Sequence, residues 1–124
     1  MPPKPEYWTI SEKQFKASKT RIDNLGQRLF ESLNKYGFTK IESQADWLGL
    51  TINKRKEESL TFVSLSLYRE TPLEFELVLR QWNVKNPSKT SKDIYRKTFH
   101  NIDEIESTYD LELKNICEQL KNGL

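Results

Sequence analysis

The chain has 124 residues and a formal net charge of +2, with 35% hydrophobic, 11% aromatic and 31% charged residues. This length predicts one domain with its own core, and the single cysteine, Cys117, excludes an internal disulfide. The sequence contains no apolar run long enough to span a membrane and no signal-peptide pattern. We therefore expect a cytoplasmic protein.

Charge is distributed unevenly along the sequence. Residues 1–97 contain 18 basic and 12 acidic side chains, whereas residues 98–124 contain 2 and 6. The sequence is therefore a charge dipole, with a longer basic part and a short acidic part at the C-terminal end.

The chain is predicted to consist of an N-terminal arm, residues 1–10, and a single α+β domain, residues 11–124. Three prolines in the arm lack a backbone donor and disfavour helix in the residues before them. The arm is therefore expected to be extended, with Tyr7 and Trp8 near its end.

A long helix is predicted over residues 11–36. Ser11 is a suitable N-cap, and Gln14 three residues later completes a capping box. Apolar residues then follow at spacings of three and four, and Gly37 stands where a left-handed residue ends a helix. The apolar stripe consists of Phe15, Ile22, Leu25, Leu29, Leu33 and Tyr36.

Four segments in the middle of the chain are predicted to be strands, because most of them alternate apolar and polar residues. Residues 69–72 join the last two segments, which predicts a hairpin. Residues 54–58 are highly charged and are predicted to be a loop. The predicted strands are residues 38–43, 47–53, 60–68 and 73–82.

Two further helices are predicted in the C-terminal part. Thr90 or Ser91 is a suitable cap for a short helix that runs to about His100. Asn101 followed by Glu104 is a capping signal for the final helix. The apolar stripe of that helix consists of Ile102, Ile105, Tyr109, Leu113, Ile116 and Leu120.

These elements predict an α+β fold in which a four-stranded antiparallel meander has the N-terminal and C-terminal helices packed on one face. Because successive residues of a strand point to opposite faces, the alternation assigns each side chain to a face. The residues predicted to face the helices are Leu48, Leu50, Ile52, Val63, Leu65, Leu67, Leu73, Phe75, Leu77 and Leu79. The residues predicted on the other face are Trp47, Thr51, Asn53, Phe62, Ser64, Ser66, Tyr68, Glu74, Glu76, Val78, Arg80 and Trp82.

The aromatic residues on that second face predict a binding surface, because protein interfaces are enriched in aromatic side chains and arginine. The anchors that we predict are Trp47, Tyr68, Arg80 and Trp82. The partner would be another protein or a second copy of the chain, since an open sheet also leaves unpaired edges. Alternatively, the arm folds back over these aromatics, or a bulge turns one of them away.

A second hypothesis is nucleic-acid binding through basic residues that are interleaved with aromatics. The pI near 8.6 and the lack of a recognised motif argue against it. A solvated basic surface explains the same residues. They are Lys54, Arg55, Lys56, Lys85, Lys89, Lys92, Arg96 and Lys97.

A third hypothesis is a carboxylate-dependent hydrolase in which Glu74, Glu76 and Asp46 hold a divalent cation. This spacing is common by chance, and pairing of the two glutamates with Arg69 or Arg80 across the sheet is the favoured explanation. No catalytic, metal-binding or cofactor-binding motif is present in the sequence. We therefore expect a non-catalytic binding or regulatory module of the adaptor, chaperone, inhibitor or immunity type, without a cofactor.

Overall fold

The computed structural model of the protein describes residues 11–43, 48–70, 72–86, 89 and 91–122. The predicted arm, residues 1–10, lies outside the described residues. Within the described chain, a sheet and two long helices form two layers. Their bounds are α1 Glu12–Leu33, the short 3-10 helix η1 Asn34–Tyr36, β1 Lys40–Ser43, β2 Gly49–Lys56, β3 Ser59–Glu70, β4 Leu73–Asn83, β5 Lys92–Phe99 and α3 Ile102–Lys121.

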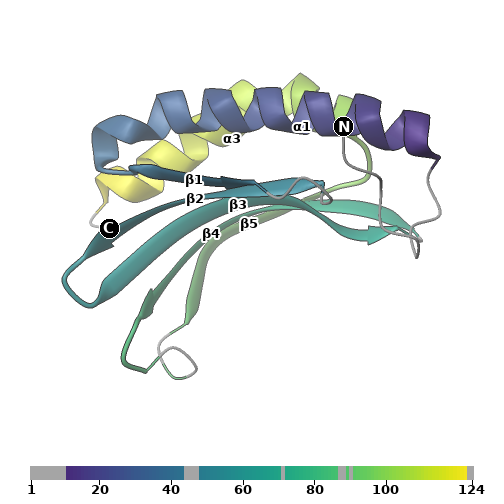
Figure 1. The fold of residues 1–124 in the computed structure, drawn as a ribbon. Coiled ribbons are helices and arrows are strands. Elements are labelled where there is room, and N and C mark those ends of the chain that lie inside the picture. Colours follow the sequence, from purple (N-terminus) through teal and green to yellow (C-terminus); the bar gives the residue numbers. More distant parts are fainter. Residues whose placement is uncertain (1–10, 44–47, 71, 87–88, 90, 123–124) are drawn as a thin grey trace.

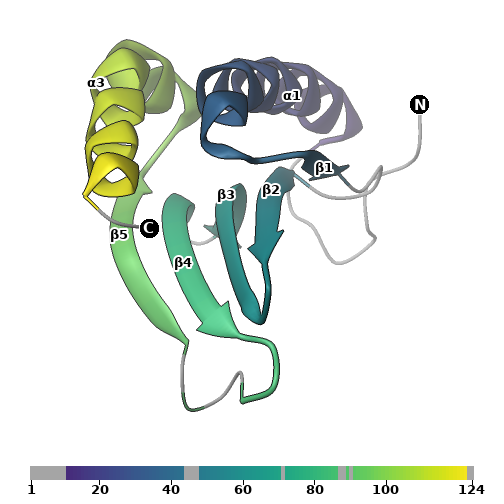
Figure 2. The ribbon, with the colours of Figure 1, turned by 90° about the vertical axis from the view of Figure 1, so that its left-hand side faces the viewer.

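The strands form one antiparallel sheet in which each strand pairs with its neighbour in the sequence, in the order β1-β2-β3-β4-β5. Both helices lie side by side over the same face of this sheet (Figure 1, Figure 2). This arrangement confirms the predicted α+β meander with both terminal helices on one face. The sheet has one strand more than the sequence predicted.

Both helices begin at the predicted caps. The Ser11 hydroxyl accepts a hydrogen bond from the Gln14 amide at 3.1 Å, and the Gln14 side chain accepts one from the Ser11 amide at 3.2 Å. Asn101 caps α3 by accepting from the Glu104 amide at 2.8 Å. Gly37 ends η1 with φ at 96°, a left-handed conformation that glycine adopts without strain.

The predicted short helix over residues 90–100 is wrong, because Lys92–Phe99 is strand β5. Side chains alternate along this segment: Phe99 is buried in the core, whereas Thr98 and Arg96 lie on the opposite face. β5 pairs with β4 along most of its length and so supplies the backbone partners that this edge of the sheet needs. The capping signal at Thr90 or Ser91 is a local feature of the sequence. It carries no information about backbone pairing between β4 and β5.

The predicted loop over residues 54–58 is also mostly strand. Residues 54–56 continue β2, with Lys54 opposite Thr61 and Lys56 opposite Ser59, and Glu57 and Glu58 form the turn. Glu57 has φ at 57°, as a tight hairpin turn requires. Charged side chains are tolerated in this part of the sheet because it extends past the end of α1 (Figure 1).

The core lies between the sheet and the helices, as the alternation predicted. The ten residues assigned to the helix-facing side all belong to this core, with Leu73 only partly buried. α1 approaches the sheet closely at Gly26, where a side-chain Cβ would collide with Leu50 of β2. Glycine at this position therefore sets the spacing between helix and sheet.

The two helices are joined by polar contacts between residues more than 80 positions apart in sequence. Arg21 of α1 pairs with Asp103 and Glu106 of α3, and Arg28 pairs with Asp110 at 2.7 Å. Basic residues of α1 therefore face acidic residues of α3, and these pairs balance part of the uneven charge along the sequence. Below them, the buried Tyr109 hydroxyl donates to the Leu25 carbonyl oxygen at 2.5 Å.

Candidate functional site

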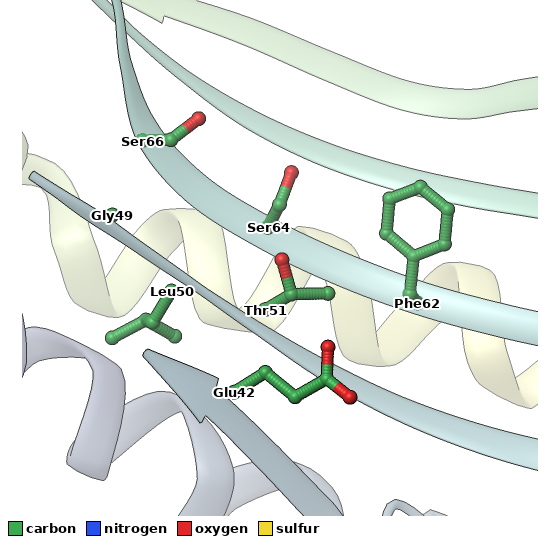
Figure 3. Close-up of a pocket in the computed structure, with 7 residues that line it drawn as sticks. All are labelled: Glu42, Gly49, Leu50, Thr51, Phe62, Ser64 and Ser66. Atoms are coloured by element: carbon green, nitrogen blue, oxygen red, sulfur yellow. The ribbon is translucent and has the colours of Figure 1, made fainter. Parts of the chain in front are cut away.

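The face of the sheet that points away from the helices, which we call the outer face, is open and hollowed. Figure 1 shows the sheet arching, with the helices over its convex side. Two adjoining hollows of about 460 and 370 Å³ lie on the outer face and share three lining residues, Glu42, Thr51 and Phe62. Figure 3 shows these side chains, from β1, β2 and β3, around the larger hollow, together with the hydroxyls of Ser64 and Ser66.

An aromatic cluster forms one end of these hollows. The rings of Phe62 and Trp82 contact each other edge to face, with centroids 4.8 Å apart and planes at 69°. The Arg80 guanidinium lies 5.8 Å from the centroid of the Phe62 ring. Trp82 and Phe62 also line the smaller hollow, together with Leu60. We call Phe62, Arg80 and Trp82 the aromatic cluster.

Ion pairs hold Arg80 in this position. Asp93 of β5 pairs with Arg80 and, through its second oxygen at 2.6 Å, with Arg96. Arg96 also pairs with Glu76, whose side chain is only 8% exposed. The two guanidinium groups lower the pKa of Asp93, mainly through their hydrogen bonds, so this carboxylate stays charged well into the acid range.

Of the three predicted anchors that the structure describes, it brings two together. Arg80 and Trp82 lie in the aromatic cluster. Tyr68 is 59% exposed but lies near the other end of β3, at a bulge where Arg69 packs 5.5 Å from its ring centroid. Trp47 falls outside the described residues. The predicted binding face is therefore concentrated at the end of the sheet that contains Trp82.

The basic residues of the nucleic-acid hypothesis do not form one continuous surface. Arg96 is paired with acidic residues on the outer face, while its neighbour Lys97 lies opposite Leu77 on the other side of the sheet. Lys85 pairs with Glu58 at 2.7 Å. The remaining members of the set are Lys54, Arg55 and Lys56 at the end of β2, Lys92 at the start of β5, and Lys89 in the segment between β4 and β5.

The carboxylates of the hydrolase hypothesis are engaged with arginines. Glu74 lies 3.8 Å from Arg69, as the sequence predicted, and Glu76 pairs with Arg96. Asp46 falls outside the described residues. Within the described part of the chain, no group of three or more potential metal ligands is clustered.

Sequence reasoning missed two members of this site. Phe62 was assigned to the outer face but not to the site, because only cross-strand register shows that it meets Trp82 and Arg80. Asp93 was missed because its segment was predicted to be helical. The alternation of residues 95–99 was the signal that could have placed Asp93 on a strand beside Arg80.

Comparison of the chain with protein-family models, with curated proteins and with solved structures finds no match in any of the three. Among the described residues, no helix is long and apolar enough to cross a membrane. We therefore infer a function from the geometry of the outer face.

Proposed function

We propose that this protein is a non-catalytic binding module of the adaptor, chaperone, inhibitor or immunity type, which binds another protein through the outer face of its sheet. The observation that supports this proposal is the aromatic cluster beside an open hollow. Half-buried aromatic rings and an arginine at the rim of a concavity are the features that binding hot spots share.

The cluster is suited to receive an apolar side chain of a partner. Trp82, Phe62 and Leu60 offer apolar surface, while Thr51 and Asn53 offer polar groups at the side of the same hollow. The ion pair with Asp93 fixes Arg80 before any partner arrives, so little side-chain freedom is lost on binding. The partner therefore meets a preformed surface.

Affinity capture with matched variants tests this proposal. The full chain is used as bait in lysate of the organism that encodes it, in parallel with Trp82→Ala and with Leu111→Ala. Leu111 is 57% exposed on α3, in the helix layer and away from the outer face, and so serves as the control. We expect one protein to be captured by the wild type and the control and lost with Trp82→Ala, which corresponds to about 2 kcal/mol or more of binding energy.

Thermal melting of the same variants separates binding from folding. Trp82 is only partly buried, so its removal should reduce stability by less than the roughly 3–5 kcal/mol typical of a fully buried aromatic. The proposal would be contradicted if the Trp82→Ala variant still captured the partner protein. It would also be contradicted if the partner were lost only because the variant unfolds. Light scattering that gives a mass above the 14.7 kDa monomer would identify a second copy as the partner.

A further inference from the structure

A further cavity lies on the opposite side of the sheet, beyond the end of α1, and is lined by lysines and hydroxyl groups. Its volume is about 350 Å³. Figure 1 shows the ends of β2 and β3 curving away from the helix layer here, which leaves this part of the helix-facing side uncovered. We call it the lysine cavity, and its lining residues are Tyr36, Gly37, Lys54, Arg55, Lys56, Ser59, Thr61 and Gln81.

Cross-strand register explains why these residues meet. Lys54 of β2 pairs with Thr61 of β3, and Thr61 pairs with Gln81 of β4. Lys56 pairs with Ser59 in the next row. Partners in an antiparallel sheet share a face, so two rows of polar side chains run across the strands where the apolar core ends. On β5, Lys92 pairs with Gln81 and adds a further positive charge to the first row.

Among the residues that the structure describes, the lysines of the cavity have no acidic partner. Lys54 donates to the Tyr36 carbonyl oxygen at 2.9 Å and lies 5.3 Å from the centroid of the Phe38 ring. Within the described chain, no ion pair joins Lys54 or Lys56 to a carboxylate. Partial burial, and then repulsion from Lys56, lower the pKa of Lys54.

Two hydroxyl groups in the cavity have protons to donate. The Gln81 amide nitrogen donates to the Ser59 hydroxyl at 3.1 Å and to the Thr61 hydroxyl at 3.3 Å. Both oxygens are therefore used as acceptors, and their own protons find no acceptor among the residues that the structure describes. Thr61 is only 3% exposed and lines the cavity, so its hydroxyl can find an acceptor in whatever the cavity holds.

We propose that the lysine cavity is an anion site that binds the phosphate group of a small molecule. Two ammonium groups supply the charge, and the two hydroxyl protons supply short-range donors to the phosphate oxygens. The contact of Lys54 with Tyr36 and Phe38 holds its ammonium group at the rim of the cavity, so the site is organised before the anion binds. Phosphate fits better than a carboxylate because its oxygens diverge toward donors on several strands. This site is separate from the outer face and does not depend on the function proposed for it.

Isothermal titration calorimetry with inorganic pyrophosphate at constant ionic strength tests the site on the full chain. The variants are Lys56→Gln, which removes one charge, and Thr61→Val, which removes one hydroxyl without changing charge or size. Lys114→Gln is the control, because Lys114 is exposed on α3 and the variant makes the same change in net charge. We expect the wild type and the control to bind equally and each site variant to bind about tenfold more weakly or worse, as for a lost hydrogen bond to a charged group.

Three results would overturn the proposal. The first is no binding of pyrophosphate by a wild-type chain that melts normally. The second is equal weakening by Lys114→Gln and Lys56→Gln, which would indicate non-specific attraction. The third is a chain that binds a single-stranded oligonucleotide but does not bind pyrophosphate. This result would indicate that the basic residues bind nucleic acid instead. Melting curves of each variant confirm that weaker binding is not caused by unfolding.

Discussion

Replacement of Gly26 by alanine should destabilise the protein, although alanine is the better helix former. In an exposed helix, this change stabilises by about 1 kcal/mol. At Gly26, however, the new Cβ would overlap Cδ2 of Leu50 and lie 2.8 Å from its Cγ and 2.9 Å from its Cδ1, far inside van der Waals contact. Leu50 is 5% exposed and packed on β2, so it has little room to move. Overpacking of a core costs about 1–3 kcal/mol.

We therefore expect Gly26→Ala to lose up to about 2 kcal/mol in free energy of unfolding, which is the overpacking cost of about 1–3 kcal/mol less the gain of about 1 kcal/mol in helix propensity. Urea denaturation followed by circular dichroism measures this difference. Asn24→Ala, on the exposed side of the same helix, is the control and should be neutral or slightly stabilising.

A double variant tests the cause. Leu50→Ala alone should destabilise by about 2–5 kcal/mol because it leaves a cavity. Gly26→Ala should then be tolerated or even favourable in the Leu50→Ala background, because the colliding atoms are gone. If Gly26→Ala stabilises the wild-type chain by about 1 kcal/mol, as at an exposed position, the close approach of α1 to β2 is refuted.

Two further predictions concern hydrogen bonds and charge. Tyr109→Phe removes the hydrogen bond to the Leu25 carbonyl oxygen and should lower the free energy of unfolding, measured by urea denaturation, by about 1 kcal/mol. An unchanged free energy of unfolding would contradict this hydrogen bond. Since the folded-state pKa of Asp93 is lowered, its ion pairs contribute stability above its unfolded pKa, near 3.9, and that contribution is lost as pH falls through the folded value. Thermal melting of Asp93→Asn should therefore show a smaller loss of stability on acidification than the wild type, and equal slopes would count against these pairs.

The elements that the sequence predicted well are those with strong local signals. The capping box at Ser11 and the cap at Asn101 placed both helices, and the alternation in β3 and β4 placed the hairpin and its faces. Each of these signals lies within a few residues, so no knowledge of distant partners was needed. The helix prediction for β5 failed because its alternation is short and contains a bulge near Ile94.

The sites were harder to predict because they depend on register between strands. Sequence parity placed Phe62, Arg80 and Trp82 on one face, but it does not show that their side chains meet there. It likewise gives no indication that Thr61 and Gln81 stand beside Lys54. Pairing is a tertiary property, and in a single sequence the charged segment 54–56 resembles a loop as much as a strand end.

The salt bridges between α1 and α3 have a consequence for the order of folding. They join residues 82 to 85 positions apart, and the whole sheet lies between them in the sequence. Hairpins such as β3–β4 form from neighbours, whereas the helix layer closes only when the last element is present. During synthesis, the helix-facing leucines of the sheet, among them Leu65 and Leu77, remain half covered until α3 leaves the ribosome. The nascent chain therefore exposes part of its apolar core face until α3 has left the ribosome.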